Sequence, residues 1–136
     1  MSFTIEDMIL TAEERYEMKF LAGKNGWANS ISWVHLLEDT TIIQNFWGKE
    51  LAVTTGLGFP QKEDWMNLAR LLNKYHASGL IINVGQYIYE VPEELKAYCD
   101  ENDLPLLTVP WEVHLSDMIK DFSIHVFLQD HTDEQI

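Results

Sequence analysis

Three short runs of apolar residues divide the second half of the chain, and each is followed by a loop that contains glycine or proline. The runs are Leu51–Thr54, Leu80–Val84 and Leu106–Val109. Strands that are covered on both faces, as in parallel sheets, have such nearly continuous apolar sequences. The pattern therefore predicts three buried strands.

Helical periodicity follows each of these strands. One pattern covers about residues 61–77, a second helix is expected to have Pro92 in its first turn, and a third covers residues 114–129. Gly79 stands where a left-handed C-cap would end the first helix. The buried stripe predicted for that helix consists of Trp65, Leu68, Ala69 and Leu72. Three successive repeats of strand, loop and helix are typical of a parallel sheet with right-handed crossovers.

The first fifty residues are less regular. Thr4 is expected to cap a helix that begins almost at once, and Met18–Ala22 has the composition of a strand. Asn25-Gly26 is a strong turn signal. Alternating residues over 31–37 predict another strand, and a short helix is expected over 40–46.

The chain has the composition of one ordinary folded domain. Hydrophobic residues make up 46% of its 136 residues, and no linker or low-complexity segment divides it. No apolar run is long enough to cross a membrane. We therefore expect a single cytoplasmic α/β domain over residues 1–136, with a mostly parallel central sheet, helices on both faces and no membrane partner.

Charge and cysteine content exclude several classes of partner. The formal net charge is −13, from 9 basic and 22 acidic residues, and Lys96 and Lys120 are the only cations in residues 90–136. Nucleic-acid binding needs clustered lysine or arginine. No direct nucleic-acid contact by this chain is therefore expected. Cys99 is the only cysteine, which excludes a disulfide framework and a thiolate metal cluster.

The sequence lacks the spacing that catalytic and cofactor sites require. No Gly-x-Ser-x-Gly nucleophile motif is present, and Gly56-Leu57-Gly58 lacks both the third glycine of a dinucleotide fingerprint and the lysine of a P-loop. The histidines have no metal-ligand spacing. They are His35, His76, His114, His125 and His131. We expect no metal, no cofactor and no catalytic residue.

Hydroxyls, glycines and an aromatic residue gather just past the predicted strand ends. The carboxyl ends of parallel strands meet at one edge of the sheet, where open α/β folds bind ligands. The candidate ligand-binding rim consists of His35, Glu38, Thr54, Thr55, Gly56, Gly85 and Trp111.

Structural roles also fit several of these loop residues. The glycines could serve only to supply positive φ angles where strands turn into helices, and Trp111 could be a core plug. Asp39, next to Glu38, fits a helix cap better than a functional role.

A series of short motifs runs through the chain in a characteristic order and spacing. They are Trp33-Val34-His35 with Glu38, Gly48-Lys49-Glu50-Leu51, Thr54-Thr55-Gly56-Leu57-Gly58, Gly79-Leu80 with Gly85, Val91-Pro92, Leu104-Pro105-Leu106-Leu107 and Val109-Pro110-Trp111-Glu112-Val113. Over about residues 5–128 this combination resembles the PucR N-terminal domain of bacterial transcriptional regulators that are named for the control of purine catabolism. Asn83 departs from the resemblance, because it makes one strand end more polar than the usual pattern.

The resemblance implies a regulatory role and supplies no catalytic residues. It implies an output region with a helix-turn-helix in a full-length protein, and no DNA-binding domain is expected in this chain. The leading hypothesis is a signal-input domain for a small effector, a purine or a degradation product. The second is a protein-interaction or dimerisation module with no small-molecule ligand, in which helix 114–129 could form a homodimer. The third is a small α/β enzyme, which a hydrogen bond between His35 and Glu38 would favour.

Overall fold

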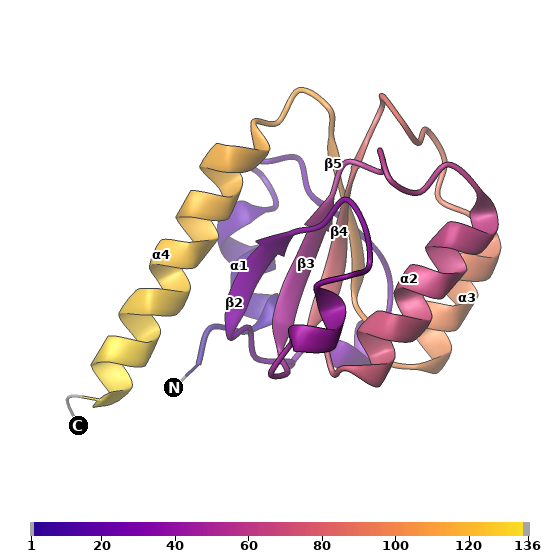
Figure 1. Ribbon diagram of the computed structural model, residues 1–136. Coiled ribbons are helices and arrows are strands. Elements are labelled where there is room, and N and C mark those ends of the chain that lie inside the picture. The colour runs from indigo at the N-terminus through magenta and orange to yellow at the C-terminus, as the bar shows by residue number, and fades with distance from the viewer. Residues whose placement is uncertain (1, 135–136) are drawn as a thin grey trace.

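A five-stranded sheet with the order β1-β5-β4-β3-β2 forms the centre of the molecule (Figure 1). The computed structural model describes residues 2–134, with side chains described for residues 2–129. The strands are β1 (Lys19–Ala22), β2 (Trp33–Leu36), β3 (Glu50–Thr54), β4 (Gly79–Val84) and β5 (Leu106–Pro110). The three strands predicted from the apolar runs are therefore confirmed as β3, β4 and β5.

The sheet is mixed rather than mostly parallel, which corrects the prediction from the sequence. Strands β2, β3, β4 and β5 pair in parallel, whereas β1 pairs antiparallel with β5. Apolar periodicity carries no information about strand direction. The α/β class itself is confirmed.

Helices cover both faces of the sheet, as predicted. On one face α1 and α4 pack over a core that includes Leu107 and Val109, and on the other α2 and α3 pack over Leu80 and Leu106 (Figure 1). The helices are α1 (Ile5–Ala12), α2 (Lys62–Lys74), α3 (Glu93–Glu101) and α4 (Leu115–Glu134). Alternate residues of a strand face opposite sides, so each central strand contributes to both cores.

The amphipathic patterns place the helices correctly. Thr4 caps α1 in a capping box with Asp7, and α2 buries the four residues of its predicted stripe. Pro92 is the N-cap of α3, so the helix begins one residue later than expected. No helix within residues 2–134 has the length and apolar composition that a membrane crossing requires.

Gly79 is not the C-cap that its position suggested. It is the first residue of β4, and His76 instead takes the left-handed conformation after α2, with φ of 61°. Gly79 is instead closely packed: a Cβ atom there would make a tight contact, 3.1 Å from the carbonyl oxygen of Pro105. A glycine selected for close approach is indistinguishable in sequence from one selected for a cap.

Two short 3₁₀ helices stand where the sequence predicted a turn at Asn25-Gly26 and a helix over 40–46. The first, η1 (Lys24–Gly26), leads from β1 towards β2, which lie at opposite edges of the sheet, so no hairpin forms. The second, η2 (Ile43–Asn45), has no side-chain cap. Strand β2 buries Val34, whereas Trp33 is exposed at this edge.

Candidate functional site

The parallel strands end together at the upper edge of the sheet in Figure 1, and the predicted rim residues lie at or just beyond these ends. Glu38 follows β2, Thr54 ends β3, Gly85 follows β4 and Trp111 follows β5. The topology thus places the candidate rim on one edge. Hydrogen bonds and ring contacts divide its members into three groups.

The first group is a hydrogen-bonded cluster around Glu38. One carboxylate oxygen, Oε1, accepts from Thr54 Oγ1 at 2.7 Å and from the backbone N–H of Thr55 at 2.9 Å. The other, Oε2, accepts from the hydroxyl of Thr55. Thr54 is fully buried, whereas Glu38 and Thr55 are half-buried. Bonds to an ionised acceptor are the stronger class, so Glu38 ties the end of β3 to the loop after β2.

The two threonines also shape the turn that follows them. The N–H of Gly56 donates to Thr54 Oγ1 at 3.1 Å, and the N–H of Leu57 donates to Thr55 Oγ1 at 3.3 Å. Gly56 has a φ of 91°, a conformation that favours glycine. Gly58 is needed for a different reason, because a Cβ there would lie 1.6 Å from the carbonyl oxygen of Glu38. The glycines therefore fit the turn closely against the Glu38 loop.

The second group joins the loops after β4 and β5. Trp111 is 38% exposed and meets the ring of Tyr87 edge-on, with centroids 5.8 Å apart. Gly85 has a φ of 121°, and a Cβ there would lie 3.1 Å from the Cβ of Trp111. Tyr87 was not identified from the sequence. The sequence feature that could have identified Tyr87 is its place as an aromatic residue two positions after Gly85, in the same loop after β4.

Asn83 explains how these two loops stay together. Its amide nitrogen donates to the carbonyl oxygen of Pro110 at 2.8 Å and to that of Val109 at 3.4 Å. Asn83 is buried, so these bonds hold the end of β4 against the end of β5 in an environment without competing water. The polar residue that departs from the family pattern thus has a structural role.

His35 stands apart from the rest of the rim. Its ring stacks on Phe46, with centroids 5.2 Å apart, and no hydrogen bond joins it to Glu38 among the described residues. Asp39 accepts from the N–H and hydroxyl of Thr41, at 2.9 and 2.7 Å, and these bonds lower the pKa of its carboxyl. Asp39 therefore stabilises its own loop.

Two surface cavities lie outside the rim. A groove of about 650 Å³ runs past Tyr16 and Asp121, and a cleft of about 500 Å³ lies where α3 begins. Neither is lined by Thr54, Thr55, Gly85 or Trp111. A ligand that used the donors of Thr54 and Thr55 would have to displace the Glu38 carboxylate.

Within the described part of the chain, no three His, Cys, Asp or Glu side chains gather in a way that could hold a metal ion. His131 lies outside the residues whose side chains are described.

Comparison with known proteins gives a family match and one curated relative. Residues 8–126 match the model of the purine catabolism regulatory protein-like family. The purine catabolism regulatory protein of Bacillus subtilis (strain 168) is 24% identical over 107 residues, which is 78% of this chain and 20% of that relative. The chain thus spans about a fifth of the length of the curated relative it matches.

Proposed function

Because this chain belongs to the purine catabolism regulatory protein-like family, we propose that it is the signal-input domain of a bacterial transcriptional regulator. Its signal is a small metabolite related to purine catabolism, either a purine or a degradation product. The family match supports the regulatory role, and the geometry of the strand-end edge supports the place of binding. In a full-length protein a helix-turn-helix region elsewhere would contact DNA in the cytoplasm.

The proposal rests mainly on the hydroxyls of Thr54 and Thr55 and the N–H of Thr55, all of which now donate to the Glu38 carboxylate. The Glu38 carboxylate accepts from both hydroxyls and from the N–H of Thr55. A metabolite with a carbonyl or carboxylate oxygen can use the hydroxyl and N–H of Thr55 in the same way. Glu38 is then an internal competitor for these donors, and ligand binding releases the loop after β2.

Such an exchange supplies the two states that a sensor needs. A ligand shifts an equilibrium only by its difference in affinity for the two states. In one state Glu38 holds the loop to β3, and in the other the ligand takes the donors and stacks on Trp111. Trp111 is partly exposed and its ring contacts Tyr87, so it offers a fixed aromatic surface. The released loop passes the signal to an attached output region.

A thermal-shift screen tests the proposal. Purines, allantoin and other ureides are added to the wild-type chain and to Thr55→Ala, with Thr11→Ala as the matched control. Thr11 lies on α1, donates only to backbone oxygens of that helix and makes no hydrogen bond with a rim residue. A compound that binds at the rim raises the melting temperature of the wild type and of Thr11→Ala, but not that of Thr55→Ala. If no compound raises it at millimolar concentration, sensing of this class is refuted.

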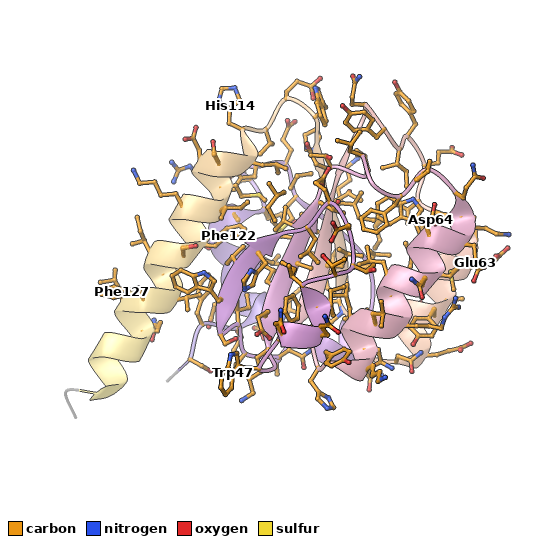
Figure 2. The ribbon with its side chains drawn as sticks, in the orientation of Figure 1. Trp47, Glu63, Asp64, His114, Phe122 and Phe127 are labelled. Atoms are coloured by element: carbon orange, nitrogen blue, oxygen red, sulfur yellow. The ribbon has the colours of Figure 1, made fainter. Side chains whose placement is uncertain are left out.

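A second candidate function, homodimerisation through helix 114–129, has its own supporting observations. Ile124, Phe127 and Leu128 are about half exposed on α4, where Figure 2 labels Phe127. Exposed apolar clusters mark interaction surfaces. Light scattering at high micromolar concentration tests it: a dimer that Ile124→Asp converts to monomer supports it, and a strict wild-type monomer refutes it.

A further inference from the structure

A cleft of about 500 Å³ lies beside edge strand β1, on the sheet face that α2 and α3 cover. Leu21, Val84 and Val91 line it with apolar surface, and they pack against the core on that face. Its volume falls within the range typical of small-molecule sites, which combine apolar walls with a few polar groups. The cleft shares no lining residue with the candidate rim.

One buried hydroxyl in this cleft has no hydrogen-bond partner. Thr108, on β5, is only 7% exposed and lines the cleft. Its oxygen makes no hydrogen bond among the described residues. Among these residues, Ser78 Oγ is the only side-chain nitrogen or oxygen that is both fully enclosed and without a partner, so the Thr108 oxygen is not fully enclosed. The Thr108 oxygen therefore keeps some accessible surface, and it is the cleft that reaches it. This hydroxyl is therefore free to form a hydrogen bond with a polar atom of a molecule in the cleft.

The start of α3 adds unpaired donors to the same cleft. Pro92 is the N-cap and has no side-chain hydrogen bond, and the N–H groups of Glu93, which lines the cleft, and of the adjacent Glu94 have no acceptor among the described residues. The N-terminus of a helix favours an anion, because its free N–H groups and dipole point outward there. The nine-residue helix thus complements the hydroxyl of Thr108.

The charges that line the cleft balance, in contrast to the chain as a whole. Lys19 and Lys96 face Glu90 and Glu93, so the formal charge of the lining is zero, whereas the chain carries −13. Lys96 pairs with Glu93 at 3.1 Å, and Lys19 has no ion pair among the described residues. A small anion is therefore repelled less here than over the acidic surface elsewhere, and Lys19 is available to it.

We infer that this cleft binds a small organic carboxylate. The carboxylate lies between Lys19 and the first N–H groups of α3, the apolar or planar body covers Leu21 and Val84, and a polar atom reaches the Thr108 hydroxyl. This site is separate from the proposed rim and does not depend on it. It gives the domain a second input, for an anion, on the opposite side of β5 from α4.

Backbone-amide NMR titration of the whole chain with benzoate tests the inference, with benzamide as the uncharged probe of the same shape. Benzoate is expected to shift the amide signals of Leu21, Val84, Glu93 and Thr108 saturably, and benzamide to bind more weakly. Lys19→Gln should raise the dissociation constant for benzoate about two- to fivefold, as expected for an exposed ion pair. The matched control Lys24→Gln, outside the cleft, should leave it unchanged.

Thr108→Val keeps the shape of the side chain and replaces its hydroxyl with a methyl group. It should leave benzoate affinity nearly unchanged, because benzoate has no second polar atom, but should weaken 4-hydroxybenzoate about three- to tenfold, as for one lost hydrogen bond. The inference is overturned if millimolar benzoate leaves the cleft amides unmoved, or if Lys19→Gln and Lys24→Gln bind it equally. It is also overturned if benzoate shifts only the Thr55, Gly56 and Trp111 signals, a result that would support the rim instead.

Discussion

Substituting Glu38 by alanine removes the acceptor that joins the loop after β2 to the end of β3. Three donors lose their partner: the hydroxyl of Thr54 and the hydroxyl and N–H of Thr55. A hydrogen bond to a charged group contributes about 1.5–3 kcal/mol to stability. Thr54 is fully buried and cannot regain water, whereas the half-buried Thr55 can, so the loss comes mainly from Thr54. We expect the free energy of unfolding to fall by about 2–3 kcal/mol.

Urea denaturation followed by tryptophan fluorescence measures this change. Glu38→Gln keeps one acceptor oxygen and should lose about 1 kcal/mol, between wild type and alanine. Glu14→Ala is the matched control, because Glu14 is exposed and has no ion pair or side-chain hydrogen bond among the described residues. If Glu38→Ala stays within about 0.5 kcal/mol of wild type, as ordinary surface substitutions do, the Glu38 cluster does not hold the loop and the reasoning is refuted.

Four further measurements test other parts of the structure. Gly58→Ala should lower the free energy of unfolding by about 2–3 kcal/mol, because its Cβ would lie 1.6 Å from the Glu38 carbonyl oxygen. An unchanged urea midpoint would contradict this. Glu50→Gln should cost about 2 kcal/mol in the same assay, because the buried carboxylate accepts two backbone N–H groups at 2.7 and 2.8 Å; a neutral effect would show that these bonds contribute nothing. Burial raises the pKa of Cys99 to about 12, so a thiol reagent should label it only after denaturation, and rapid labelling of the native chain would refute its burial. Burial and the hydrogen bond to Asp121 raise the pKa of Tyr16 from 10.0 to about 12, so the folded state holds the phenol proton more tightly than the unfolded chain does. The contribution of Tyr16 to stability should therefore be complete below pH 10 and lost towards pH 12. Urea unfolding at a series of alkaline pH values measures this loss.

The helices and central strands could be predicted because their periodicity reflects burial. Each apolar residue of the α2 stripe is buried, and the capping box at Thr4 marks the start of α1. Strand direction could not be predicted, since β1 is an edge strand whose pairing with β5 joins residues far apart in the chain, such as Lys19 and Thr108. Local sequence does not record such contacts.

The candidate site was predictable in position but not in its contacts. Residues that follow strand ends reach one edge in any parallel arrangement, which is why Glu38, Thr54 and Thr55 were identified together. The bonds from Glu38 to both threonines join two loops that are 16 and 17 residues apart in the chain, and no periodicity encodes such a contact. His35 was separated from the group because its ring stacks on Phe46.

A crystal structure of this chain, soaked with the purine-related compound that most raises its melting temperature, tests the central claim most directly. The account predicts that the compound lies against Thr55, Gly85 and Trp111, with an oxygen accepting from the Thr55 hydroxyl and the Glu38 carboxylate turned away. A compound bound elsewhere, with Glu38 still bonded to Thr54 and Thr55, would contradict it.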